Sequence, residues 1–291
     1  MSHVSLAARV RPPAERALRV RRRLLQTPVV RFEHQGTGRT VTVVGVVHIG
    51  QAAYYRRLNT VLARLEAAGA LVCYEYVAPA ADTEWSAVDP AERDGWNATV
   101  ATNREISQAA CRYLGWVLQA EAMAYAETWR NVDMTEAEFV QRGGALSLGG
   151  LDLSVKDLFG ERSQDRQDVL LGHAAAALMR LVALDRYRLL RHVARSDSMR
   201  VMLDQRNERA LASLPSDRDA VLIWGANHLP GLAAGLQQAG YRRQAGAWLS
   251  VGELPPLRTS AQAIWGVLRE DRPGSAVAPG QDPGSAGSSG M

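Results

Sequence analysis

Residues 41–50 read VTVVGVVHIG, and this stretch decides how the rest of the chain is interpreted. The apolar run over residues 41–44 predicts a buried strand. The strand is expected to break at Gly45 and to present His48 at its carboxyl end. A glycine at this point lets the backbone turn sharply and approach a ligand without a side chain in the way.

A helix and a second strand follow directly. Residues 51–68 predict a helix that closes at Gly69. Residues 70–76 read ALVCYEY and predict a strand that carries Glu75 inside an apolar run. Strand, helix and strand in this order favour a parallel crossover unit.

The same pattern returns near the other end of the chain. Residues 220–224 predict a strand, which Gly225-Ala226-Asn227-His228 interrupts. A helix over residues 229–239, a closing glycine and a strand over residues 241–251 follow. The pattern Gly-x-x-His therefore occurs twice, each time between a strand and a helix.

The fold class that these units predict is α/β. Residues 28–34 alternate apolar and polar side chains and should form a hairpin with residues 40–47. We expect a central mixed sheet built from two strand–GxxH–helix–strand units, with a largely helical insertion at about residues 85–215.

The insertion itself is less regular in its pattern. Its expected parts are a loop-rich connection (79–97), a helix broken near Gly115 (102–127), a short strand (129–134), a helix capped by Thr135, a flexible glycine-flanked stretch (143–150), and helices over 164–195 and 196–214. A short amphipathic helix over 260–268 follows the last strand.

The ends of the chain differ from its middle in composition. The 291 residues carry a net charge of +4. Residues 1–27 hold seven arginines against one glutamate, so the rest of the chain is slightly acidic. We expect a flexible Arg-rich arm at 1–27, a single domain at 28–270, and a disordered Gly/Ser/Pro-rich tail at 271–291.

The expected location is cytoplasmic. No stretch is long and apolar enough to span a bilayer, and no apolar segment of a secretory signal follows the first charges. Cys73 and Cys111 match no metal spacing, and Cys73 in its strand is expected to be a small buried hydrophobe.

The candidate site joins His48, Glu75 and His228. Ligands of open α/β sheets bind beyond the carboxyl ends of the strands, where both histidines are expected. Two histidines and a carboxylate match the ligand set of metal hydrolases that keep an open position for water. Without a metal, the same residues could act as an imidazole base oriented by a carboxylate. A single histidine after a strand is more often structural, and the repetition of the motif is what favours a site.

A helix near residue 206 supplies a further candidate. Arg206 is expected to clamp an oxyanion or carboxylate, with Arg209 on the same helix face and Asn207 pointing elsewhere. A solvated helix surface is the competing interpretation. The secondary candidates are Gly45, Gly225, Asn227, Arg57 and Asp133, the last as a partner that orients a histidine.

Several familiar motifs are absent from the sequence. It contains no GxGxxG, no GxxxxGK[ST] and no GxSxG. A nucleotide cofactor is therefore not expected, and neither is a serine nucleophile elbow.

The two motifs resemble the TraB family, which includes PrgY and the Tiki proteins. VVGVVHIG is similar to its first Gly-x-x-His motif, LVCYE to its glutamate strand, RNERAL to its Arg-containing helix, and IWGANHLPGLAAGLQQAGY to its second motif. The similarity covers about residues 40–78 and 196–252. Erythromycin esterases and ChaN-like haem-binding proteins are similar at the superfamily level.

The resemblance implies a hydrolase site. It assigns catalytic roles to His48, Glu75, Arg206 and His228, and it implies a divalent metal (Mn, Co or Zn) held by the two histidines and the glutamate. The expected reaction is cleavage of a peptide, amide or ester bond in a peptide or small-molecule substrate by activated water.

Other functions remain open at this point. The first alternative is a non-catalytic protein that binds a peptide or small ligand in the same cleft, as pheromone-shutdown proteins do. The Arg-rich arm could bind nucleic acid by charge alone, although a solvated tail is the simpler interpretation. The sequence is also compatible with a homo-oligomer.

Overall fold

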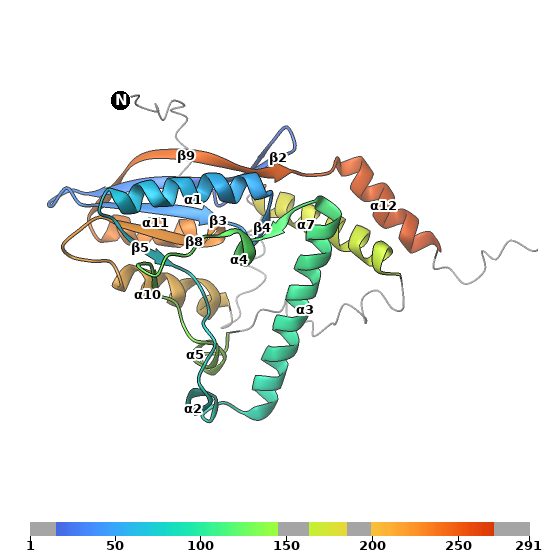
Figure 1. Cartoon of the computed structure of the whole chain (residues 1–291), viewed down its shortest axis with the longest axis horizontal. Coiled ribbons are helices and arrows are strands. Elements are labelled where there is room, and N and C mark those ends of the chain that lie inside the picture. Colours follow the sequence, from blue (N-terminus) through green and yellow to red (C-terminus); the bar gives the residue numbers. More distant parts are fainter. Residues whose placement is uncertain (1–15, 145–162, 185–198, 271–291) are drawn as a thin grey trace, which may run out of the picture.

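Apolar strands from both halves of the chain form one mixed sheet (Figure 1). The computed structural model describes residues 16–144, 163–184 and 199–270. Within these residues the strand order is β1-β2-β3-β8-β5-β7, and β9 also pairs with β2. The strands of this sheet are β1 (Arg19–Arg21), β2 (Leu24–His34), β3 (Thr40–Val46), β5 (Leu71–Tyr74), β7 (Arg130–Asn131), β8 (Ala220–Gly225) and β9 (Tyr241–Glu253).

Three neighbouring strands at the centre of the sheet are parallel. In the β3–β8 pair Val46 lies opposite Gly225, and in the β5–β8 pair Tyr74 lies opposite Ile223. Because parallel strands point the same way, β3, β8 and β5 all end at one edge. The expected α/β fold with a central mixed sheet is confirmed, and so is the hairpin of β2 and β3.

The helices that follow the two Gly-x-x-His turns cover opposite faces of the sheet. Figure 1 shows α1 (Ala52–Ala67) in front of the strands and α11 (Leu229–Gln238) behind them. In β8, Ile223 belongs to the core cluster under α1, whereas Leu222 and Trp224 belong to the cluster under α11. This is the alternation of side chains that a strand buried on both faces requires.

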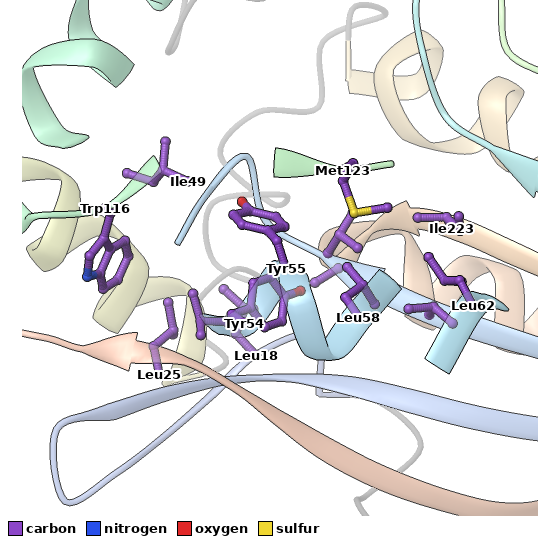
Figure 2. Packing of buried hydrophobic residues seen from close by; sticks show 14 of the residues in the cluster. Leu18, Leu25, Ile49, Tyr54, Tyr55, Leu58, Leu62, Trp116, Met123 and Ile223 are labelled. Atoms are coloured by element: carbon purple, nitrogen blue, oxygen red, sulfur yellow. The ribbon is translucent and has the colours of Figure 1, made fainter. Parts of the chain in front are cut away.

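The core under α1 explains why the first helix forms where it does. Tyr54, Tyr55, Leu58 and Leu62 recur at helical spacing and are fully buried. Figure 2 shows these side chains gathered in the same cluster as Ile223. Each fully buried leucine contributes about 1.5–3 kcal/mol to stability, so this stripe fixes α1 on the sheet.

The insertion contains more helix than expected in its first part. Residues 79–97 do not form an extended loop, because α2 (Asp82–Trp85) and the first two turns of α3 (Pro90–Leu114) lie there. Asp89 caps α3 by accepting a hydrogen bond from the backbone N–H of Ala91 at 2.7 Å, and Pro90 occupies the first turn. The Asp-Pro pair therefore starts a helix. The expected break at Gly115 is confirmed, with φ at +64°.

The remaining helices and one small ribbon complete the described structure. Thr135 caps α5 as expected, accepting from the backbone N–H of Glu138 at 3.3 Å. The other elements are α2 (Asp82–Trp85), α3 (Pro90–Leu114), α4 (Gln119–Ala122), α5 (Glu136–Gln141), α7 (Gln164–Ala183), η1 (Arg200–Gln205), α10 (Arg206–Ala212), η2 (Ala226–His228), α12 (Leu257–Glu270), and the two-stranded ribbon of β4 (Ile49–Gly50) and β6 (Val117–Leu118).

Some expectations concern residues outside the described ranges. These are the first part of the arm (1–15), most of the stretch flanked by glycines (145–162), the end of the 164–195 helix and the start of the 196–214 helix (185–198), and the tail (271–291). The expectation of a flexible arm was wrong for its second part, residues 16–27. Residues 19–21 and 24–27 belong to β1 and β2, and Leu25 is fully buried, so the folded part begins earlier than expected.

Candidate functional site

The carboxyl ends of β3, β8 and β5 form the edge where the candidate residues lie. His48 follows β3 by two residues, Glu75 directly follows β5, and His228 lies in η2 after β8. Neighbouring strands are about 4.8 Å apart, so the ends of β3 and β5 flank β8 at a separation of about 10 Å. Chain segments leave β3 and β8 toward opposite faces, which is the arrangement at which open α/β sheets bind ligands.

Glu75 places a nearly buried carboxylate at this edge. Its side chain is 12% exposed. Oε1 accepts a hydrogen bond from Arg206 Nη2 at 2.6 Å, and Oε2 accepts one from the backbone N–H of Gly225. His228 Nε2 lies 3.4 Å from Oε1.

The surroundings of Glu75 keep it ionised. Burial alone would raise the pKa of this carboxyl group. The imidazole of His228, the guanidinium of Arg206 and the Gly225 amide outweigh burial and hold the pKa well below its usual range. Glu75 is therefore a carboxylate at neutral pH, although almost no water reaches it.

Arg206 joins Glu75 to a second carboxylate. Its Nε donates to Asp133 Oδ1 at 2.9 Å, and its Nη2 donates to Asp133 Oδ2 as well as to Glu75. The side chain of Arg206 is 7% exposed and that of Asp133 is fully buried. The guanidinium also lies 5.9 Å from the ring of Phe139. Burial lowers the pKa of Arg206, but Glu75 and Asp133 raise it overall, so the cation persists.

The backbone that presents Arg206 is irregular. Arg206 begins α10 directly after η1, a π-helical segment of six residues. Such segments are rare and occur frequently at functional sites, because the wider turn changes the direction of the side chains that follow. Directly after this segment, two successive side chains, Arg206 and Asn207, lie on the buried side of the helix.

Asn207 and Glu75 orient the imidazole of His228. Nδ1 of His228 lies 2.9 Å from Asn207 Oδ1, and its side chain is 5% exposed. A carboxylate can only accept, so a hydrogen bond between Nε2 and Glu75 requires the proton on Nε2. Two carboxylates and one guanidinium therefore meet beside this imidazole.

Two glycines give the cluster its close approaches. A Cβ on Gly225 would lie 3.1 Å from Glu75 Oε2, and a Cβ on Gly231 would lie 2.2 Å from Asn207 Nδ2. A larger residue at position 231 would force the Asn207 amide to move, and one at position 225 would press on the Glu75 carboxylate. The glycine of the second Gly-x-x-His motif thus makes room for a protein side chain.

His48 is placed differently from His228. It is exposed, and among the described residues its side chain has no hydrogen bond or ion pair. The turn that carries it is fixed through the backbone, since Tyr55 Oη donates to Val47 O at 2.8 Å and the N–H of Gln119 donates to His48 O at 2.7 Å. A fixed turn with a free imidazole presents that imidazole to whatever binds at the edge.

The geometry does not assemble the expected metal ligands. Within the part of the chain that the structure describes, no three His, Cys, Asp or Glu side chains are grouped so that they could hold one metal ion. Both oxygens of Glu75 already accept hydrogen bonds, and His228 faces protein atoms on both ring nitrogens. A metal ion would have to displace Arg206 or Asn207, so these side chains as placed fit a network of ion pairs better than a metal centre.

Three secondary candidates have other partners. Gly45 lies inside β3, and a Cβ there would lie 3.0 Å from Pro28 Cδ, so it serves strand packing and does not break the strand. Arg57 is exposed and donates to Ser250 O on β9 at 2.7 Å. Asp133 binds Arg206 and not a histidine, because its strand end faces α10.

Gly225 and Asn227 remain at the edge. Gly225 donates its N–H to Glu75, as described above. Asn227 is half-buried, and its Oδ1 is a buried atom without a hydrogen-bond partner in the described structure. A buried acceptor without a partner is uncommon and costly, which favours a ligand or water donor at this position.

Asn207 is the site residue that sequence reasoning missed. Arg206 and Arg209 were expected to share a face, but Arg209 lies outside and binds Glu138 Oε2 at 2.6 Å. Arg206 and Asn207 share the buried face, because neighbours on a helix are only 100° apart and a buried stripe is at least that wide. The glycine at position 231 was the available signal, since it leaves room for a side chain from another helix.

Comparisons with known proteins found no match for the chain. Its sequence matches no family model, no curated protein and no solved structure. Over the residues described, none of the helices combines the length and the apolar character needed to cross a membrane.

Proposed function

We propose that this protein is a TraB-like hydrolase that cleaves a peptide, amide or ester bond by activated water at the edge formed by β3, β8 and β5. The observation that supports the proposal is the buried network of Glu75, Arg206, Asp133 and His228 at this edge. Removing four ionisable groups from water costs several kcal/mol for each ion, and apolar side chains would hold the fold at least as well. Clusters of this kind are typical of functional sites.

Each residue at the edge would have a separate role in the proposed reaction. His48 is exposed and has no side-chain partner in the described ranges, so it would take the proton of the attacking water as a general base. Glu75 and Asn207 hold His228 in one orientation beside the edge, so it acts as a positioning residue. The protonated imidazole of His48 would then return its proton to the leaving group. The unpaired Oδ1 of Asn227 would accept a hydrogen bond from the substrate.

Arg206 has a supporting role in this proposal. Its guanidinium donors are directed at Glu75, Asp133 and the carbonyl of Met202, so it holds Glu75 ionised and in place. Stabilisation of an oxyanion would then come from another donor at the edge. We therefore treat Arg206 as a positioning residue.

Water activation without a metal accords best with these contacts. A metal-dependent form would require Glu75 to exchange its bond with Arg206 for a bond to the ion. The alternative function, binding without catalysis, is favoured by one observation: Glu75 and His228 are already satisfied by protein partners and nearly buried.

The test is a hydrolysis screen of the full chain over peptides, lactones and esters. Each substrate is assayed with a chelator and with added Mn, Co or Zn, and the purified protein is analysed for bound metal. We expect activity on at least one class that persists in the chelator and falls at least 100-fold in Glu75→Gln, with Glu33→Gln as the matched control.

The outcomes separate the three possibilities. Activity that requires a metal bound in stoichiometric amount, and lost in Glu75→Gln, would replace the metal-free mechanism with the metal-dependent one. Saturable binding of a substrate analogue without any turnover would support the binding protein and contradict the hydrolase.

A further inference from the structure

A second polar feature lies away from the cluster around Glu75. A cavity of about 480 Å³ opens between β1, α7 and the start of α12. Figure 1 shows α7 and α12 beside each other at the end of the sheet. The cavity shares no lining residue with the candidate site, and its size is that of an ordinary small-ligand pocket.

The polar side of this cavity is made of arginines. Arg16, Arg19, Arg23 and Arg180 line it, and none of the described lining residues is an aspartate or glutamate. Arg23 binds the exposed Glu253 at 3.1 Å. Arg19 binds Gln26 at 2.7 Å and stacks on the ring of Trp248 at 4.4 Å, so its charge is not neutralised.

Arg180 is the informative member of this group. It is only 9% exposed. Its Nη2 donates to the carbonyl oxygen of Pro255, whereas its Nη1 is buried and has no hydrogen-bond partner in the described structure. Burial lowers the pKa of Arg180, and the nearby Arg23 lowers it further. A buried guanidinium with an unused donor and no carboxylate partner destabilises the fold, unless an anion accepts its hydrogen bond and balances its charge.

The remaining wall of the cavity is apolar. Val20, Leu184 and Leu257 line it together with smaller aliphatic groups. Leu184 is 68% exposed and Leu257 is 65% exposed, so large apolar side chains stand uncovered beside the arginines. Most exposed leucines need no explanation, but two at the rim of one cationic cavity favour a ligand with a hydrocarbon part.

We propose that this cavity binds a small organic anion that carries a hydrocarbon chain. A carboxylate or phosphate head would accept hydrogen bonds from Arg180 Nη1 and from Arg16, which has no acidic partner among the described residues. The chain would cover Val20 and Leu257. Guanidinium groups suit both heads, because their donors match two oxygens at once. This site does not depend on the proposed hydrolase.

The test is isothermal titration calorimetry of the full chain with decanoate, decyl phosphate, decanol and inorganic phosphate. Each amphiphile is kept below its critical micelle concentration. We expect saturable binding of one ligand per chain for decanoate, decyl phosphate or both, at least tenfold tighter than for decanol or inorganic phosphate. The stronger of the two heads identifies the natural anion class.

Variants locate the binding. Arg180→Met and Arg16→Ser should each weaken binding at least fivefold, and Leu257→Asp should weaken it similarly. Arg218→Ser, which removes an exposed arginine paired with Asp217, is the matched control and should leave binding unchanged. If Arg180→Met does not fold, Arg16→Ser and Leu257→Asp carry the test, since both residues are exposed.

Three results would overturn the proposal. The first is no saturable binding of either anion. The second is equal binding of decanol, or of inorganic phosphate, which would remove the need for an amphipathic anion. The third is binding that survives both Arg16→Ser and Leu257→Asp.

Discussion

The two Gly-x-x-His turns share a sequence pattern but differ in structure. After β8, His228 is buried and held between Glu75 and Asn207, whereas after β3, His48 is exposed and its side chain has no partner among the described residues. The difference lies in the neighbours of the two strands. β8 has parallel strands on both sides, and Asn207 of α10 contacts the turn that follows it. The turn after β3 continues into the β4–β6 ribbon.

The comparison shows that one motif can supply two kinds of imidazole. The buried one is oriented by a carboxylate and an amide, and the exposed one can meet a ligand. Even the two glycines differ, since Gly225 makes room for Glu75 and Gly45 makes room for Pro28. Three changes can break or sharpen this comparison.

The largest effect is expected at Arg206, which contacts the buried cluster around Glu75 and His228. Arg206→Met should reduce the free energy of unfolding by about 3–5 kcal/mol, because Glu75 and Asp133 would remain buried without their cation. Urea denaturation measures the loss. Arg209→Met is the control from the next helical turn, and it should cost less than about 1 kcal/mol because its pair with Glu138 is exposed. Equal losses in the two variants would contradict the account.

The second effect compares the histidines directly. His228→Ala should reduce the free energy of unfolding by about 1–3 kcal/mol, since Asn207 and Glu75 each lose a partner in a buried place. His48→Ala should change it by no more than about 0.5 kcal/mol, as exposed side chains without contacts do. Thermal and urea unfolding of both variants checks this. A large loss in His48→Ala would mean that its imidazole has a structural partner.

The smallest effect is the pH dependence that Glu75 gives to stability. Its folded pKa lies below its unfolded value, so its contribution is present above the unfolded pKa of about 4.3 and is lost as the pH falls toward the folded pKa. The difference in unfolding free energy between wild type and Glu75→Gln should therefore narrow by about 1 kcal/mol between pH 5 and about pH 3. A difference that stays constant over this range would show that the carboxylate is not held ionised by the fold.

Much of the fold could be predicted because its signals are local. Apolar runs marked β3, β5 and β8, and Gly69 and Gly240 marked the helix ends. The meeting of Glu75 and His228 also followed, because parallel strands end at one edge. The start of α3 was missed because Asp89-Pro90 serves equally as a turn and as a helix start, and the pattern beyond it did not decide between them.

The rest of the site depends on contacts between distant segments. The expected metal set placed His48 beside Glu75 and His228. No local sequence pattern could reveal that the Glu75 carboxylate already accepts a hydrogen bond from Arg206. The buried stripe of α10 also falls on Arg206 and Asn207, and Arg209 lies outside it, because the stripe is set by the elements that pack on the helix. Partners of this kind follow from packing between elements, which spacing along one helix does not encode.

The most direct test of the account is a double-mutant cycle on kcat/KM with His48→Ala, His228→Ala and the combined variant. If the two turns act in one site, each single variant lowers kcat/KM by about 10²–10⁴-fold, and the double variant falls little further than the slower single variant. Effects that multiply, or a His48→Ala variant with the kcat/KM of wild type, would contradict the claim that both histidines serve one reaction.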